Sequence, residues 1–305
     1  MLRNSLSGLH PFSKIIFSLF IVLACFLVIF LVALLIAIPV FNISVSELSN
    51  YIGDYKNPHN VAFLKYLQTV QSVGLFIVPA FITGYLMHQN TYAFLGFNVK
   101  INMQRAMAAV IIMLVALPLV NYLGIINSTM QLPEWLSGFE QWMKDKETGA
   151  QELTMAFLVM KNKGQLIFNI FMIGLLPAIG EELIFRGIFQ RIFTDWTKNI
   201  HWGIFIAAFL FSTMHFQFYG FLPRLLLGML FGYLFYWSRS IWIPMLVHFV
   251  NNTTAVFAYY FYPDKINQEV ESFESVPGLE IFLILNAAIF ALLLYRFYRK
   301  SNVTH

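Results

Sequence analysis

Eight apolar runs divide this chain of 305 residues, and they constrain its fold more than any other feature of the sequence. A helix needs about 20 mainly apolar residues to cross the hydrocarbon core of a bilayer. Only 11% of the residues are charged, against about 25% in a typical soluble domain. We therefore predict an all-α polytopic membrane protein with about eight transmembrane helices. The runs cover residues 15–40, 66–88, 106–126, 166–189, 202–214, 222–237, 241–260 and 279–295, of which the fifth and sixth are short.

The basic residues of the connections predict that both termini face the cytoplasm. Lysine and arginine in short loops mark the cytoplasmic side of a membrane protein. The alternate connections are mostly acidic at residues 264–274 or mixed in charge at residues 134–163. The net charge of +4 follows from the same rule and requires no nucleic-acid partner. Basic residues precede the first run, follow the last one and occupy every second connection (Arg3, Lys14, Lys100, Arg105, Arg191, Lys198, Arg239, Arg296, Arg299 and Lys300).

The apolar runs also suggest how the chain is organised. We expect residues 1–165 to hold three transmembrane helices and an extracytoplasmic amphipathic segment, residues 166–260 a core of four helices, and residues 261–305 a loop and the last helix. The stretch PEWLSGFEQWMKD suggests an interfacial helix, although an ordinary loop fits about equally well. Short connections without an appended domain favour a bacterial inner membrane.

Three charges interrupt the fourth apolar run, in the stretch GLLPAIGEELIFRGIFQRIF. A charge at the centre of a bilayer costs about 2.5–3.5 kcal/mol even on a lenient insertion scale. Glu182 and Arg186 are four residues apart and can pair on one face of a helix. Glu181 lies about 100° around the helix from Glu182 and has no arginine at the same spacing. We interpret Glu181 as a functional carboxylate beside a structural ion pair, the alternative being that both glutamates serve only helix packing.

Two histidines lie within apolar runs, and each has a companion four residues away on the same helix face. His215 follows Phe211, and His248 precedes Asn252, with Asn251 about 100° away from it. Taken singly, such polar residues usually join helices by hydrogen bonds. Together with a carboxylate, two imidazoles and an amide could activate a water molecule and stabilise an oxyanion. One carboxylate and two imidazoles with an open fourth position also form a known zinc-binding set.

The segments EELIFR, FSTMH and HFVNN resemble the EExxxR, FxxxH and HxxxN/D motifs of the CPBP family, the CAAX-processing and bacteriocin-processing intramembrane proteases. They occur in the family's order on separate apolar runs. The resemblance implies an eight-helix fold, a catalytic core at residues 166–260, and hydrolysis of a peptide bond in a membrane-associated protein or peptide. It assigns activation of water to Glu181 and His215, stabilisation of the oxyanion to His248 and Asn252, and support of the site to Glu182, Arg186, Phe211 and Asn251.

The resemblance leaves the need for a metal undecided, because the family is described both as metalloproteases and as metal-free glutamate proteases. If a divalent metal such as Zn²⁺ takes part, we expect Glu181, His215 and His248 to hold it. The chain lacks the HExxH helix of soluble zinc proteases.

Two other functions are weighed against the protease. A non-catalytic immunity or scaffold protein could retain the same fold and motifs. A proton-coupled transporter could use Glu181 and the histidines as a relay, although the sequence has no inverted repeat of the kind found in many transporters. Replacement of Glu181 by Gln should abolish proteolysis and spare a binding role.

Two geometric expectations concern the core. His215 lies about 13 residues into its run, or about 20 Å along a helix, which is deeper than we expect for Glu181. Either the fifth helix starts late and tilts, or the fourth run is broken at residues 177–180, where Pro177 favours a break. The stretch GMLFG at residues 228–232 is a GxxxG motif and predicts a close contact between helices.

Overall fold

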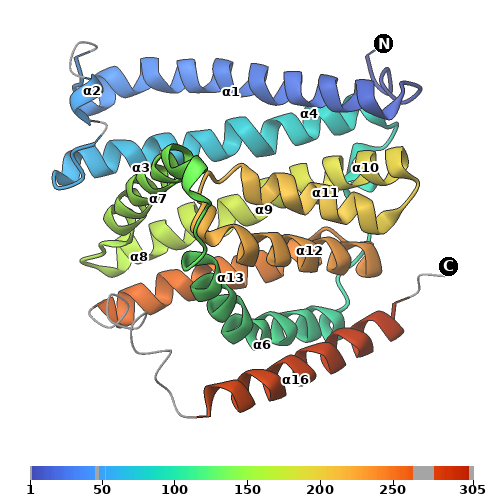
Figure 1. The fold of residues 1–305 in the computed structure, drawn as a ribbon. Helices are drawn as coiled ribbons and strands as arrows, with labels where there is room; N and C mark the ends of the chain where they lie inside the picture. Colours follow the sequence, from blue (N-terminus) through green and yellow to red (C-terminus); the bar gives the residue numbers. More distant parts are fainter. Residues whose placement is uncertain (1, 45–47, 52, 264–277, 302–305) are drawn as a thin grey trace.

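The chain folds into layers of helices that run roughly side by side (Figure 1). The computed structural model describes residues 2–44, 48–51, 53–263 and 278–301, and the regular structure of these residues is helical, with no strand. The predicted all-α class is therefore confirmed. The first half of the chain forms α1 (Pro11–Phe41), α2 (Leu48–Tyr51), α3 (Pro58–Ser72), the π-helical η2 (Val73–Ile77), α4 (Val78–Met87), α5 (Thr91–Leu95), α6 (Met103–Ser128), the 3-10 turn η3 (Glu134–Leu136) and α7 (Ser137–Leu158).

A helical stretch of 35 residues, Lys163–Thr197, opens the second half of the chain and carries both glutamates. It is built from α8 (Lys163–Asn169), the π-helical η4 (Ile170–Leu175), α9 (Leu176–Glu182), the π-helical η5 (Leu183–Phe189) and α10 (Gln190–Thr197). It is followed by α11 (Ile200–Thr213), the 3-10 turn η6 (Phe218–Gly220), α12 (Phe221–Ser238), α13 (Trp242–Phe261) and α16 (Leu279–Arg299).

Each of the eight predicted runs lies in a helical stretch, and the chain has the character of an integral membrane protein. Among the described residues, six helical stretches are long and apolar enough to cross a bilayer: Pro11–Phe41, Pro58–Met87, Met103–Ser128, Lys163–Thr197, Phe218–Ser238 and Leu279–Arg299. The apolar α11 is shorter, with 14 residues. A count of eight crossings stays a prediction, as does the side on which the termini lie. The acidic segment at residues 264–274, used above for orientation, lies outside the described residues.

Asparagine side chains begin five of the helices. In each case the side-chain oxygen accepts a hydrogen bond from a backbone N–H of the first turn, which would otherwise lack a partner. Such a cap is especially valuable where a helix begins in a membrane, because few other partners exist there for a free N–H. The five are Asn57 before α3, Asn90 before α5, Asn102 before α6, Asn162 before α8 and Asn199 before α11.

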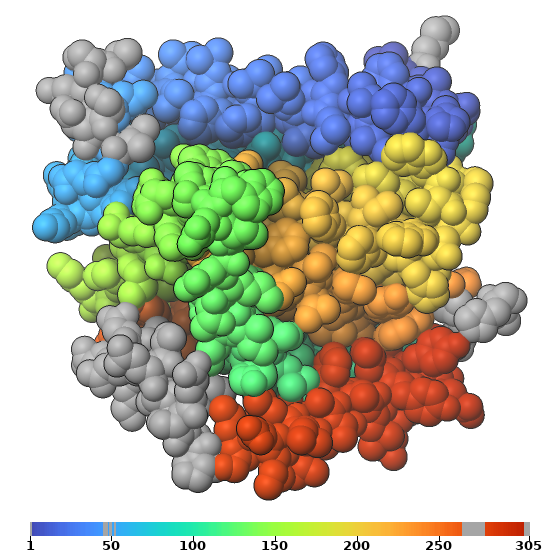
Figure 2. All heavy atoms as spheres, viewed as in Figure 1, coloured from blue at the N-terminus to red at the C-terminus, as the bar shows by residue number. Residues whose placement is uncertain are grey.

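Helices α1 and α16 form the two outer edges of the molecule (Figures 1 and 2), and α9 lies between them (Figure 1). Only four residues of α1 and two of α16 are buried, and many of their apolar side chains are exposed. By contrast, every residue of η5 is buried. An exposed apolar surface at both edges suits contact with lipid, so the buried glutamates are shielded from lipid by the surrounding helices.

The helix that carries the glutamates is not broken at residues 177–180, so this one of our two alternatives is wrong. Leu176–Glu182 is regular α-helix, continuous with the π-helical turns on either side. The helical stretch also continues to Thr197, two turns beyond the predicted end at residue 189. Glu181 therefore lies about 24 Å from that end, and His215 lies about 20 Å from the start of α11. Glu181 and His215 therefore lie at similar depths, although the helix is not broken.

The predicted amphipathic segment is a helix, α7, that lies in front of the layers (Figure 1). Its first two turns and the preceding η3 expose Trp135, Phe139 and Trp142. Phe139 and Trp142 also lie against Phe218 of η6, with ring centroids 6.2 and 5.5 Å from the Phe218 ring. Exposed aromatic rings on an amphipathic helix are typical of an interfacial position, which favours the interfacial helix over an ordinary loop.

Candidate active site

The three motifs come together from three separate parts of the chain. Glu181 and Glu182 end α9, which packs against α13. His248 lies in α13, six residues after Trp242. His215 follows the last turn of α11. Phe211 joins the two histidines, because its ring lies 5.0 Å from the His215 ring and 6.0 Å from the His248 ring.

Glu182 is the centre of a fully buried network of hydrogen bonds. Its Oε1 accepts from Arg186 Nη1 at 2.7 Å and lies 2.8 Å from His248 Nδ1. The ion pair between Glu182 and Arg186 expected from their spacing is therefore present, with side chains 0% and 1% exposed. Since a carboxylate only accepts, Nδ1 of His248 carries the proton and its Nε2 is directed elsewhere. The carboxylate of Glu182 thus sets the orientation of the imidazole.

The buried guanidinium of Arg186 makes hydrogen bonds and cation–π contacts, which a buried charge needs to offset its desolvation. Besides Glu182, it donates from Nη2 to the carbonyl oxygen of Gly228 on α12 at 2.9 Å. Its guanidinium lies 5.0 Å from the ring centroid of Phe211 and 5.4 Å from that of Phe231. Cation–π contacts of this kind stabilise a desolvated arginine by up to about 2 kcal/mol. Arg186 is thus a structural cation rather than a group free to bind substrate.

Glu181 has different surroundings from its neighbour. Its Oε2 lies 3.8 Å from His248 Nε2, beyond hydrogen-bond distance, and its side chain is 11% exposed. Within the described part of the chain its carboxylate makes no hydrogen bond. It is the one of the two glutamates that is free to accept a proton.

His215 presents one ring nitrogen for chemistry. Its Nδ1 lies 2.7 Å from the carbonyl oxygen of Phe211, so in the neutral ring Nδ1 carries the proton and Nε2 is a base. Electrostatic interactions link His215 to Glu181, His248 and Arg224, which places all four groups in one neighbourhood.

Asn252 is engaged by the helix that carries the glutamates. Its Nδ2 donates to the carbonyl oxygen of Ile173 at 3.1 Å, and its Oδ1 accepts from Asn251 at 3.1 Å. The carbonyl of Ile173 is free because Pro177, four residues later, has no N–H to donate. One proton of the Asn252 amide is therefore used structurally, and the second is left for another acceptor.

Sequence reasoning missed two residues beside this site. The Phe231 ring stacks on His248 at 5.1 Å, and nothing in the sequence distinguishes it from the many other phenylalanines. Arg224 is a half-buried cation with electrostatic links to Glu181 and to Glu147 of α7. Since Arg224 is a charge inside an apolar run, the argument that drew attention to Glu181 would also have found it.

The expected metal set does not form a metal site in this structure. Among the described residues, no three His, Cys, Asp or Glu side chains are arranged so that they could hold a metal ion. Nδ1 of His248 and Nδ1 of His215 are both bound to protein oxygens, so only the Nε2 atoms of the two rings could bind a metal, and the need for a metal stays undecided. We therefore derive no chemical step through a metal.

Comparison with known families decides what this constellation resembles. Residues 163–254 match the family described as type II CAAX prenyl endopeptidase Rce1-like. This part of the chain is similar to the Rce1-like family. The match covers all three motifs, confirms the resemblance stated from them, and favours a protease over the non-catalytic and transporter alternatives.

One curated relative is the uncharacterized protein YpbD of Bacillus subtilis (strain 168). It is 30% identical over 115 residues, which cover 35% of this chain and 55% of the relative. The chain thus spans about half the length of that relative. No solved structure gives a significant match.

Proposed function

We propose that this protein is an intramembrane endopeptidase that hydrolyses a peptide bond of a membrane-associated protein or peptide, with prenylated CaaX sequences as the first candidates. The Rce1-like match supports the reaction class. The observation that carries the proposal is the contrast between two adjacent carboxylates. Glu182 is bound by Arg186 and His248, whereas Glu181 makes no hydrogen bond and faces His248 Nε2. In such a pair, the bound carboxylate of Glu182 stabilises the site and the unbound carboxylate of Glu181 acts as the general base.

We assign each step of the hydrolysis to the side-chain atoms that make no hydrogen bond within the site. Glu181, with Nε2 of His215, takes a proton from water, and the water oxygen attacks the peptide carbonyl carbon. In its protonated form, His248 keeps Nδ1–H on Glu182 and offers Nε2–H to the oxyanion, beside the remaining Asn252 N–H. The proton held by Glu181 then passes to the amine nitrogen as the carbon–nitrogen bond breaks. Burial behind the outer helices keeps bulk water away from these groups.

The first test compares purified wild-type and Glu181→Gln protein on fluorogenic membrane-associated peptides, including farnesylated CaaX peptides. We expect cleavage to fall at least about a hundredfold in the variant, because loss of a general base typically costs that much. Folding should be unchanged, since Gln fits the same space. The matched control is Glu152→Gln, which removes an exposed carboxylate from α7 and should leave the rate unaltered.

Two results would contradict the proposal. Equal loss in Glu152→Gln would assign the effect to net charge, and undiminished cleavage by Glu181→Gln would remove Glu181 from the chemistry. Each assay is repeated with a chelator. Activity that survives the chelator supports the metal-free reaction, whereas activity lost to chelator and restored by Zn²⁺ would establish a metal enzyme.

A further inference from the structure

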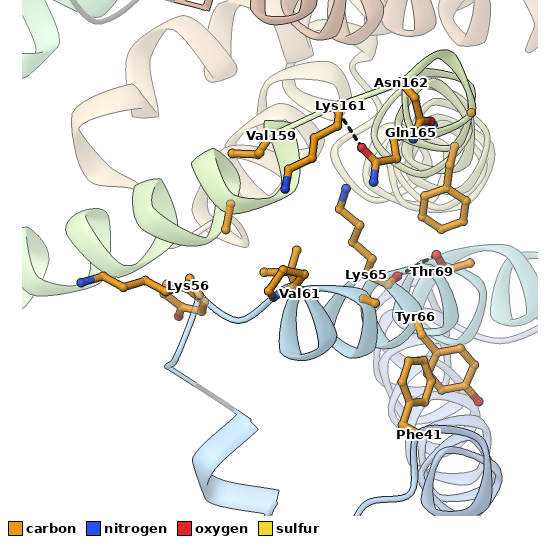
Figure 3. Close-up of a pocket in the computed structure, with 16 residues that line it drawn as sticks. Phe41, Lys56, Val61, Lys65, Tyr66, Thr69, Val159, Lys161, Asn162 and Gln165 are labelled. Atoms are coloured by element: carbon orange, nitrogen blue, oxygen red, sulfur yellow. Dashed lines mark hydrogen bonds between the residues drawn. The ribbon is translucent and has the colours of Figure 1, made fainter.

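A cavity of about 780 Å³ lies apart from the glutamates, between α3 and the junction of α7 with α8 (Figure 3). Its wall includes Phe41 at the end of α1, and none of the residues assigned to catalysis lines it. Pockets for small molecules usually measure about 300–1,000 Å³, so the space suits a ligand of moderate size.

The charges on the wall of this cavity are all of one sign. Lys56, Lys65 and Lys161 line it, and no aspartate or glutamate does. Figure 3 shows the side chains of Lys65 and Lys161 reaching into the space between α3 and the α7–α8 junction, while Lys56 points away from it. Two ammonium groups that share one space repel each other, and an anion between them would remove this repulsion.

The environment of Lys65 gives a second reason to expect an anion in the cavity. It lies in the membrane-spanning stretch Pro58–Met87 and is half-buried. Its Nζ donates to Asn169 Oδ1 at 2.9 Å, and Asn169 in turn donates to the carbonyl oxygen of Phe157 at 2.7 Å. Both acceptors are neutral, so within the described part of the chain no carboxylate balances this charge. A cation in a membrane helix normally has an anionic or hydrogen-bonded partner, and here a position for the anion remains open.

Much of the rest of the wall is apolar, and part of it is exposed. Phe41 and Tyr66 line the inner side, whereas Val159 and Phe168 are exposed, with 60% and 40% of their surface accessible. A small hydrophilic anion would use the lysines but leave these side chains uncovered. A ligand with an anionic group and a hydrocarbon chain would use both.

We propose that this cavity binds an anionic phospholipid, with the phosphate between Lys65 and Lys161 and the first part of an acyl chain along Val159 and Phe168. Lysine and arginine side chains near a membrane surface attract anionic lipid headgroups by about 1 kcal/mol each. A structural phospholipid there would join α3 to the α7–α8 junction. The inference is independent of the proposed peptidase activity.

The test titrates dioctanoyl phosphatidylglycerol into the purified full-length protein in a non-ionic detergent and counts bound lipid by native mass spectrometry. Wild-type protein should prefer it at least about tenfold over dioctanoyl phosphatidylcholine. Lys161→Gln and Lys65→Gln should each weaken its binding about fivefold, the usual contribution of one basic residue near a membrane surface. Gln at position 65 can still donate to Asn169, which limits any loss of folding.

The matched control is Lys163→Gln, an exposed neighbour that does not line the cavity, and it should change the affinity less than twofold. Glu181→Gln should bind the lipid as the wild type does, so failure of the peptidase proposal would be distinguished from failure of this one. Equal affinity for the two lipids, or an equal loss in Lys163→Gln, would overturn the proposal. Glycerol 1-phosphate that competed as well as the lipid would replace the lipid by a soluble phosphate and also overturn it.

Discussion

Glu181 and Glu182 are neighbours in the sequence, yet their carboxylates have unlike surroundings. Glu182 is 0% exposed and its Oε1 is shared by Arg186 and His248. Its Oε2 is buried without a hydrogen-bond partner among the described residues, which is costly unless the charge is needed there. Glu181 is also buried, with 11% of its side chain exposed, but makes no hydrogen bond in the described structure. Glu182 therefore stabilises the site, and the chemical role proposed for Glu181 stays a prediction.

This contrast gives a prediction at the residue scale. Glu182→Gln leaves the buried Arg186 without its counter-charge, and breaking a buried pair in this way costs about 3–5 kcal/mol. Glu181→Gln should cost about 1 kcal/mol or less, because no hydrogen bond is lost. Thermal unfolding of both variants in the same detergent measures the difference. A lower unfolding temperature for Glu181→Gln than for Glu182→Gln would reverse the assignment of the two roles.

At the scale of single elements, Pro177 shows why a helix-breaking residue need not break a helix. The π-helical η4 precedes it, and there Leu176 N–H bonds to the carbonyl of Phe171. The carbonyl of Ile173, freed by the proline, accepts from Asn252. Neighbouring side chains can satisfy such carbonyls inside a membrane protein. The hydrogen bond from Asn252 therefore joins α13 to η4, at the carbonyl that Pro177 leaves free.

The contact between α11 and α12 depends on small residues, as the GxxxG motif predicted. A Cβ at Gly228 would lie 3.0 Å from Ala208 Cβ, and one at Gly232 would lie 2.8 Å from Ile204 Cγ2. The close approach also exposes the two glycine carbonyls. Gly228 O accepts from Arg186, and Gly232 O accepts from Gln190 at 3.2 Å. The motif therefore serves packing inside this chain.

Gly232→Ala should lower stability by about 1–3 kcal/mol, because the added methyl overpacks the interface and presses on Gln190. Gly124→Ala is the matched control, since a Cβ at that position of α6 meets nothing within 4 Å. There the substitution should stabilise the helix by about 0.5–1 kcal/mol. Unfolding temperatures of the two variants should move in opposite directions. A fall of similar size in both would mean that crowding at Gly232 is not the cause.

At the scale of the whole molecule, the start of α1 and the end of α16 lie at the same end of the bundle (Figure 1). Arg105 at the start of α6 donates to the carbonyl oxygen of Lys300 just after α16, which places both at that end. Arg191 of α10, with Lys198 and Arg239 just after α10 and α12, lines one further pocket. These basic residues lie in two groups, and the side of the membrane that they face stays a prediction.

We expect both ends of the chain to be labelled from the same side of the membrane. Single cysteines introduced by Ser7→Cys and Ser301→Cys, with the native thiol removed by Cys25→Ser, should react with an impermeant maleimide only in inside-out vesicles. Ser128→Cys, at the other end of α6, should react only in right-side-out vesicles. Labelling of Ser7→Cys and Ser301→Cys from opposite sides would contradict an even number of crossings.

The sequence by itself determined the helical class, the approximate places of the long helices and the pair of Glu182 with Arg186. These depend on periodicity and on the scarcity of charge, which act over a few neighbouring residues or over the chain as a whole. It also drew attention to Glu181, because a charge in an apolar helix needs an explanation.

Only the tertiary structure decided which residues meet across helices. The hydrogen bond from His248 to Glu182 spans 66 positions, that from Asn252 to Ile173 spans 79, and that from Arg186 to Gly228 spans 42. The shift and rotation of one helix against another result from many packing contacts spread along both, so spacing within either sequence cannot reveal them. That is why Phe231 and the lysine-lined cavity emerged only from the folded chain, and why the sequence could not exclude a break at Pro177.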